Sequence, residues 1–174
     1  MKNPEQNRSC SLILSEQTFP IIEQITAGMP GGFFIYHADG EEKLIYANQS
    51  LIKMYGCENL EEFQELTGYV FPGLVHPDDL EEAEQSIKQQ IFAGNNNLDY
   101  IEYRIIRKDG SIRWIEDYGH FVHTDSYGDI FYVFVEDATE KKNKAIDDAR
   151  TVRLAQERLE ALKHETATLK LMHE

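Results

Sequence analysis

The chain has 174 residues, 41% of them apolar, with nine Phe and nine Tyr, which suffices for one packed domain with extensions. No apolar run approaches the roughly 18 residues that span a bilayer, and the first residues lack the apolar segment of a secretory signal. We therefore expect a cytoplasmic protein without membrane contacts. Two cysteines, Cys10 and Cys57, are too few for a disulfide framework or a zinc site.

The net charge of −14 is unevenly distributed. Residues 140–174 carry eight Lys and Arg against seven Asp and Glu, so the excess of negative charge lies in the preceding body. An acidic body repels phosphate backbones, which argues against nucleic-acid binding. A segment of balanced, alternating charge is typical of a helix that packs against a partner helix.

The first part of the chain predicts a helix followed by a hairpin. Residues 1–17 are polar and are expected to be disordered or frayed. Apolar residues at three- and four-residue spacing predict a flanking helix within 18–31, which Pro30-Gly31-Gly32 ends. Two short β-prone runs, 33–36 and 44–47, predict the hairpin.

Short helices are predicted next. Asn48 and Asn59 stand where their side chains can cap helices over 49–55 and 60–66. Residues 71–75 have no regular pattern and are expected to be irregular.

The longest helix of the body is predicted to begin after His76-Pro77-Asp78-Asp79 and to run to about residue 93. Proline and acidic residues favour a helix start, and Asp78 with Glu81 matches a capping box. Leu80, Ala83, Ile87 and Ile91 form its apolar stripe.

Three strands are predicted to follow, over 98–107, 111–123 and 130–136. Asp109-Gly110 tolerates positive φ, so the first two should form a tight antiparallel hairpin. Strands grouped at both ends, with helices between them, predict an α+β fold. We expect a five-stranded antiparallel sheet with helices on one face, plus the flanking N-terminal helix and a long C-terminal helix.

From residue 140 the apolar residues recur with a period of 3.5, and 140–174 contains no Gly or Pro. This pattern predicts one uninterrupted helix that self-associates as a coiled coil. Its seam contains Ala145, Val152, Ala155, Leu159, Leu162, Thr166 and Leu169, and is weakened by Ala and Thr at core positions. A sheet whose last strand leads directly into such a helix is suited to passing strain along it, which favours a sensor over an enzyme.

The body resembles a PAS domain, of the subclass that ends in a PAC motif. The resembling segments, in order and at suitable spacing, are Tyr46-Ala-Asn48, His76-Pro-Asp-Asp79, Glu102-Tyr-Arg-Ile105, Lys108-Asp-Gly-Ser-Ile-Arg-Trp114 and Asp137-Ala-Thr139. The last has Ala where the family triplet has Ile. The resemblance covers about residues 19–142 and implies the strand order 2-1-5-4-3.

The resemblance implies a PAS/PAC domain over 32–139, followed by a coiled-coil signalling helix over 140–174. Such domains are sensory and dimerisation modules, and in bacteria they usually precede a histidine kinase, a diguanylate cyclase or further PAS units. We therefore expect a homodimer in two-component or cyclic-di-GMP signalling, controlling an effector or further PAS domain of a longer parent chain.

Two alternatives remain open. His164-Glu165 is similar to a histidine-kinase phosphoacceptor box, so the chain could be a kinase fragment with His164 as phosphoacceptor, although the following Pro of that box is missing. The other alternative is a dimerisation scaffold without a ligand. No Gly-rich nucleotide-binding segment is present in the sequence, so we expect no enzymatic activity.

The cofactor, if one binds, is unknown from the sequence. Haem-binding PAS domains use a His on the long helix, and residues 78–93 contain none. Flavin photosensors use a Cys within Asn-Cys-Arg-Phe, which the surroundings of Cys57 do not match. Haem and a thiol-adduct flavin are therefore not expected. His76 is interpreted as part of a helix start, and His120 and His123 should point to opposite faces of one strand, where they cannot share a metal ion.

Apolar and aromatic side chains between the sheet and the helices are candidates to line a small-molecule pocket. The candidates are Phe34, Tyr36, Tyr46, Met54, Tyr55, Phe71, Ile87, Ile91, Tyr103, Ile105, Trp114 and Phe121. A filled core would have the same composition, so both possibilities stay open.

Asp137 and Thr139 are the expected signal-output junction. Their side chains can hydrogen-bond to backbone where the last strand gives way to the helix and so fix the exit of the helix. The resemblance implies that this aspartate pairs with a nearby base, for which an Arg or Lys of the hairpin could serve.

Overall fold

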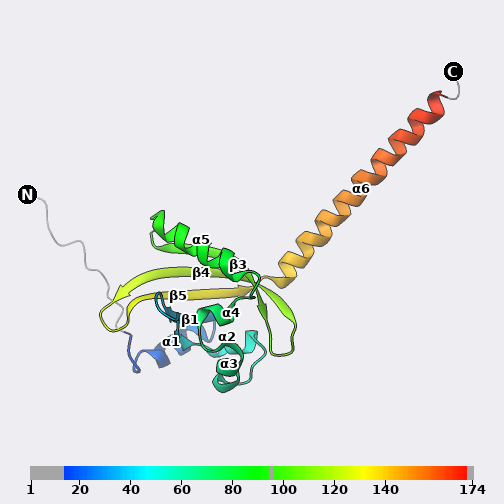
Figure 1. Cartoon of the computed structure of the whole chain (residues 1–174). Coiled ribbons are helices and arrows are strands. Elements are labelled where there is room, and N and C mark those ends of the chain that lie inside the picture. The colour runs from blue at the N-terminus through cyan, green and yellow to red at the C-terminus, as the bar shows by residue number, and fades with distance from the viewer. Residues whose placement is uncertain (1–13, 95, 172–174) are drawn as a thin grey trace, which may run out of the picture. The chain divides into compact units, whose positions relative to one another are not determined.

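The computed structural model describes residues 14–94 and 96–171, except for the side chains of 168–171 (Figure 1). Most of the expected disordered segment, residues 1–17, lies outside these residues. The chain divides into two compact units, 1–137 and 138–174.

The first unit contains five strands and five helices among its described residues. In order these are α1 (Phe19–Thr26), β1 (Gly32–His37), β2 (Leu44–Ala47), α2 (Gln49–Met54), α3 (Leu60–Thr67), α4 (Phe71–Leu74), α5 (Leu80–Phe92), β3 (Leu98–Ile106), β4 (Ile112–Thr124) and β5 (Gly128–Asp137). The second unit is α6 (Thr139–Leu171). No described helix has the length and hydrophobicity needed to span a bilayer.

The five strands form one antiparallel sheet in the order β2-β1-β5-β4-β3. The predicted α+β class and the expected strand order are therefore confirmed. The two longest strands, β4 and β5, run side by side in Figure 1, and β5 holds the central position of the sheet.

The sheet buries both faces against different helices, because alternate residues of a strand point to opposite sides. On β1, Phe34 and Tyr36 point into the main core, which α2 to α5 cover. Phe33 and Ile35 point to the other face, where they pack with Phe19 and other residues of and before α1. The flanking helix thus covers the face that the remaining helices leave open.

The predicted hairpin between β3 and β4 is confirmed. Gly110 has φ +79°, which is the conformation that the Asp-Gly pair was expected to supply. The Asp109 carboxylate accepts a hydrogen bond from the Ser111 N–H (2.9 Å). The turn is anchored to the helices, since the Arg107 guanidinium donates to the carbonyl of Met54 (3.0 Å).

Both predicted asparagine caps are present. The side-chain oxygen of Asn48 accepts from the N–H of Leu51 (2.9 Å), and that of Asn59 accepts from the N–H of Glu62 (2.9 Å). Asn48 also accepts from the N–H of Phe33 (2.9 Å), so the same side chain fastens α2 to β1.

Two expectations about the middle of the chain are wrong. Residues 71–75, expected to be irregular, contain the short helix α4. The capping box of Asp78 and Glu81 is absent, because α5 has Asp79 at its N-cap position and no side-chain cap. The carboxylate of Asp79 is instead engaged by Arg104 on β3.

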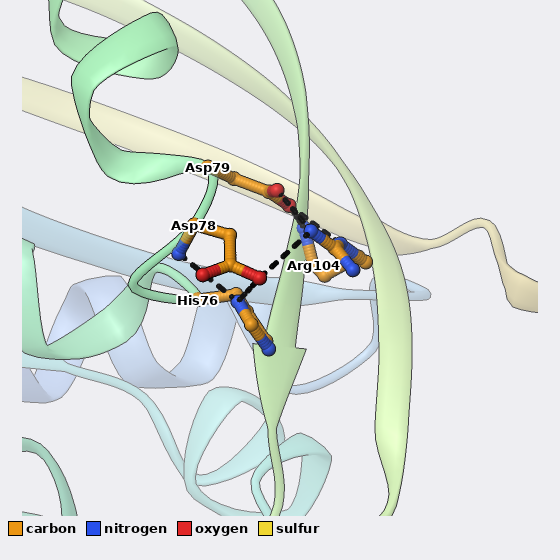
Figure 2. Close-up of polar contacts among 4 residues, drawn as sticks. All are labelled: His76, Asp78, Asp79 and Arg104. Carbon is orange, nitrogen blue, oxygen red and sulfur yellow. Dashed lines mark hydrogen bonds and ion pairs between the residues drawn. The ribbon is translucent and has the colours of Figure 1, made fainter.

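Helix α5 and the segment before it cover the free edge of β3 (Figure 2). The Asp79 carboxylate accepts from both the backbone N–H and the Nε–H of Arg104 (2.9 Å each), and the His76 N–H donates to the Arg104 carbonyl (2.7 Å). Further along, the Gln90 side chain bonds to the N–H (3.0 Å) and carbonyl (2.8 Å) of Tyr100. Because an open strand edge invites pairing with another chain, these contacts also protect the sheet.

His76 has the structural role that was predicted for it. Its Nδ1 accepts a hydrogen bond from the Asp78 N–H (3.2 Å), and Figure 2 shows the ring beside the start of α5. The segment His76-Pro-Asp-Asp79 is therefore a fastening between helix and strand.

Helix α6 is exposed along its length, with every side chain from residue 143 to 167 open to solvent. On the predicted seam, Val152, Leu159 and Leu162 are each more than half exposed. Ala155 and Thr166 are exposed as well, whereas the side chain of Leu169 lies outside the described residues.

The contact between Asp79 and Arg104 leads to a stability prediction. Asp79→Asn should lower the free energy of unfolding at pH 7 by about 1–2 kcal/mol, because it weakens charge-assisted hydrogen bonds that join α5 to β3. Hydrogen bonds from Arg104 lower the pKa of Asp79, so this stabilisation is present above the unfolded-state pKa and is lost as the pH falls through the folded-state pKa. Urea unfolding at pH 7 and pH 3 measures both effects.

Asp78→Asn is the matched control. The Asp78 side chain is 75% exposed and its carboxylate lies 3.9 Å from the Arg104 guanidinium, so its loss should change stability little. Equal destabilisation by the two substitutions would contradict the role given to Asp79.

Candidate functional site

A cavity of about 300 Å³ lies between the inward face of the sheet and α5. Strands β1, β4 and β5, helix α4 and the loop between β1 and β2 complete its wall. The lining residues are Tyr36, Ala38, Glu42, Phe71, Glu84, Ile87, Lys88, Ile91, Phe92, Phe121 and Phe131.

The structure brings only part of the predicted pocket together. The candidates that line the cavity are Tyr36, Phe71, Ile87, Ile91 and Phe121. The candidates that belong to the adjoining packed core, without lining the cavity, are Phe34, Met54, Tyr55, Tyr103 and Ile105. The inward face therefore contains both a filled core and a hollow beside it.

The expectation is wrong for Tyr46 and Trp114, which lie on the opposite face of the sheet. Tyr46 stacks on Phe19 of α1 (centroids 5.3 Å apart) and donates its hydroxyl hydrogen bond to Glu23. Trp114 faces the Arg104 guanidinium (5.8 Å), because the register of the hairpin directs its neighbour Ile115 into the core.

Several lining residues were missed from the sequence, namely Ala38, Glu42, Glu84, Lys88, Phe92 and Phe131. Phe131 could have been found, since it shares a period-two pattern with the buried Val133 and Val135 on a strand whose existence was predicted. The charged residues carry no such signal, because they belong to a loop and to the less apolar side of a helix.

Two buried carboxyl groups on the same sheet face were also missed. Asp117 on β4 is 2% exposed and accepts a hydrogen bond from the Tyr103 hydroxyl (2.8 Å). Burial raises the pKa of Asp117 well above its usual range, although the hydrogen bond from Tyr103 opposes the rise.

Asp99 on β3 is 5% exposed, and its Oδ1 has no hydrogen-bond partner among the described residues. It pairs in register with Gly119 of β4, and a Cβ at Gly119 would lie 2.3 Å from that oxygen. Glycine is therefore what leaves room for the carboxyl on the inward face. Burial raises the pKa of Asp99 to about 6.

The Tyr36 hydroxyl connects these carboxyl groups to the cavity. Tyr36 lines the cavity and is 2% exposed. Its pKa is raised mainly by burial and then by the negative charges of Asp117 and Asp99, followed by those of Glu42 and Glu84. The hydroxyl thus lies within electrostatic reach of all four acidic side chains.

Glu42 holds an unusual backbone conformation at the edge of the cavity. Its φ of +52° lies in the left-handed region, which is costly for a residue with a Cβ. The conformation is held by hydrogen bonds from the Phe71 N–H to the Glu42 carbonyl (2.9 Å) and from the Glu42 N–H to the Asp39 carbonyl (3.2 Å). Burial raises the pKa of the Glu42 carboxyl, and the charge of Glu84 adds to the rise.

Most of the part of the chain that forms the five-stranded sheet and its cavity also matches a known family by sequence. A family model described as the PAS fold matches residues 44–135, which is more than half of the chain. The chain belongs to the PAS-fold family. No curated protein matches the sequence.

Solved structures are similar to this PAS domain at low identity, which supports the fold alone. A sensory box histidine kinase/response regulator from Burkholderia thailandensis E264 has a TM-score of 0.54 at 19% identity, over 79% of this chain and 96% of that one. An RNA-binding light-oxygen-voltage receptor has 0.59 at 17%, over 84% and 41%. A PAS domain from a two-component sensor histidine kinase has 0.53 at 17%, over 71% and 99%.

Cys57 of this PAS domain lies in the packed core and does not line the cavity. Burial raises the pKa of its thiol, which favours the unreactive protonated form. Among residues 14–94 and 96–171, no group of three or more His, Cys, Asp or Glu is placed to hold a metal ion. His120 packs against Tyr132, and His123 contacts Asp129 (2.7 Å), so the two rings have separate partners.

The predicted output junction begins at the end of β5. The Asp137 carboxylate lies 3.8 Å from the Arg113 guanidinium on β4, both side chains being about 40% exposed. Arg113 therefore supplies the base that the resemblance implied. Thr139 is the first residue of α6, and the Lys142 N–H bonds to the Ala138 carbonyl (2.9 Å), so Ala138 occupies the position before the helix.

Asp99 generates a prediction about pH. Its folded-state pKa of about 6 exceeds the usual value for Asp, so the folded state binds a proton more tightly than the unfolded chain. Stability of the wild type should therefore fall, relative to Asp99→Asn, by about 1–2 kcal/mol as the pH rises from 4 to 7, after allowance for solvent screening. Denaturant unfolding across this range measures the difference.

The exposed residue Asp125 provides the control. Asp125→Asn should follow the wild-type curve of stability against pH. If Asp99→Asn also follows it, Asp99 does not titrate as a buried group.

Proposed function

We propose that this PAS domain is a non-enzymatic, cytoplasmic sensory module that passes a change in its cavity into the helix that follows it. The observation that carries the proposal is that β5 contributes to the cavity wall at Phe131 and ends six residues later at Asp137. Helix α6 begins two residues after that, at Thr139. A short stretch of one strand therefore connects the cavity-lining residue Phe131 to the start of α6 at Thr139.

The path along β5 is rigid enough to carry a displacement. Phe131, Val133 and Val135 point successively into the core, and the strand is bonded to β1 on one side and β4 on the other. A shift of Phe131 would therefore move the strand against both neighbours. The ion pair of Arg113 with Asp137 joins β4 to the last residue of β5, where such a shift would reach the linker.

The exposed apolar seam of α6 supports a homodimeric coiled coil as the output. Val152, Leu159 and Leu162 occupy the a and d positions of one heptad frame, and more than half of each side chain is open to solvent. Most helical stability in proteins comes from packing of an apolar face, so pairing two seams would remove apolar area from water and stabilise both helices. The partner that reads this coil would be an effector or a further PAS domain, in two-component or cyclic-di-GMP signalling.

Two other functions follow from single features. His164 is exposed on α6, as a phosphoacceptor must be, so phosphotransfer from a separate kinase is a second candidate. Loss of that transfer in His164→Gln would support it. A scaffold without a ligand is the third candidate, and it differs from the first only in whether the cavity is occupied.

Native mass spectrometry of the purified chain tests the proposal. We expect a dimer that carries the additional mass of a non-covalent small molecule. A dimer that stays bare after exposure to cell extract would favour the scaffold, and a monomer would contradict the coiled-coil output.

The seam can be tested by substitution. Leu159→Glu should abolish the dimer, because it places a charge at the centre of the paired apolar surface. Leu154→Glu is the control, since Leu154 is equally exposed (55% against 54%) but lies off the seam. Sedimentation equilibrium distinguishes the two, and equal weakening by both substitutions would show that the seam is wrongly assigned.

A further inference from the structure

The cavity carries more negative than positive charge. Glu42, Glu84 and Lys88 line it, and Lys88 lies 3.7 Å from the Glu84 carboxylate, so these two charges largely offset each other. For Glu42, the effect of burial and of the Glu84 charge on its pKa is larger than the opposing effect of Lys88, so its pKa is raised. Asp99 and Asp117, which face the same Tyr36 hydroxyl, add two further carboxyl groups behind the lining.

One carboxyl group in this region has unused hydrogen-bonding capacity. The Asp99 Oδ1 is buried without a partner among the described residues, and Tyr36, whose hydroxyl is within electrostatic reach of Asp99, lines the cavity. Asp99 lies opposite Gly119, and the next inward-facing residue of β4 after Gly119 is Phe121, which lines the cavity. The unpaired carboxyl and the hollow are thus neighbours on one sheet face.

A buried carboxylate without a counter-charge is costly in free energy, and most native proteins pair such groups. A cationic group placed beside Asp99 would satisfy its free oxygen and supply the missing charge. An anionic ligand would instead be repelled by the carboxylates of Glu42 and Asp99.

The remainder of the wall is apolar and limits the size of the ligand. Phe71, Ile87, Ile91, Phe121 and Phe131 surround a volume of about 300 Å³, at the lower end of the range for small-molecule sites. Such a wall favours a compact aliphatic or aromatic body.

We propose that the cavity selects a small amphipathic cation, consisting of an apolar or aromatic body with an ammonium group, and that Asp99 is the counter-ion of that group. The Tyr36 hydroxyl accepts a second hydrogen bond from the ammonium. This proposal rests on the proposed sensory function and names the chemical class of its ligand.

Three compounds of nearly equal size provide the test, namely 2-phenylethylamine, 2-phenylethanol and phenylacetate. Isothermal titration calorimetry of the full chain at pH 7.5 should show the amine binding about tenfold more tightly than the alcohol, and the carboxylate more weakly than either. In Asp99→Asn the preference for the amine over the alcohol should fall to about twofold or less, whereas the affinity for the alcohol should persist. Persisting affinity for the alcohol also shows that the variant is folded.

The other outcomes separate this inference from the sensory function. Equal or tighter binding of the alcohol or the carboxylate would overturn the selection of cations and leave a ligand-binding cavity. A preference for the amine that survives in Asp99→Asn would overturn the role of Asp99. Failure of all three compounds to bind at about 10 mM would overturn this inference, whereas the sensory function is tested separately by native mass spectrometry.

Discussion

The register between β4 and β5 is the constraint on which the cavity and its chemistry depend. The two strands pair over ten residues, and this pairing decides which side chains of each strand point inward. A shift of one residue would exchange the two faces. Phe121 or Phe131, depending on which strand moved, would then leave the cavity, and the outward side chains of that strand would turn towards α2 to α5.

The same register places Asp117 and Gly119 on the inward face, and Gly119 in turn leaves room for Asp99. A carboxyl group in such a place opposes folding when it is ionised, whereas an apolar residue there would fill the space at no electrostatic cost. A binding role for Asp99 accounts for this loss of stability, because proteins depart from the rules of a well-packed core at their functional sites.

Much of the fold could be predicted from local sequence signals. Asn48, Asn59 and the Asp109-Gly110 turn act through hydrogen bonds or dihedral angles within a few residues, so their roles follow from the sequence nearby. Asp79 could not be assigned in this way, because its partner Arg104 is 25 residues distant and competes with the helix cap.

The site was less predictable than the fold because it depends on which face of each strand is buried. Tyr46 and Trp114 have the composition of pocket residues, but α1 and Arg104 respectively hold them on the other face. Asp99 and Asp117 carry no sequence signal of burial at all, since their inward position results only from strand pairing. Long-range register, and not residue type, therefore decides the chemistry of this cavity.

The most direct test is whether occupying the cavity changes α6. Hydrogen exchange of the full chain, with and without saturating 2-phenylethylamine, reports on both regions in one experiment. We expect slower exchange in α5 and β5 together with altered exchange at residues 139–150, and we expect the second effect to disappear in Arg113→Gln. Protection of α5 and β5 with unchanged exchange in α6 would contradict a coupling between the cavity and the helix.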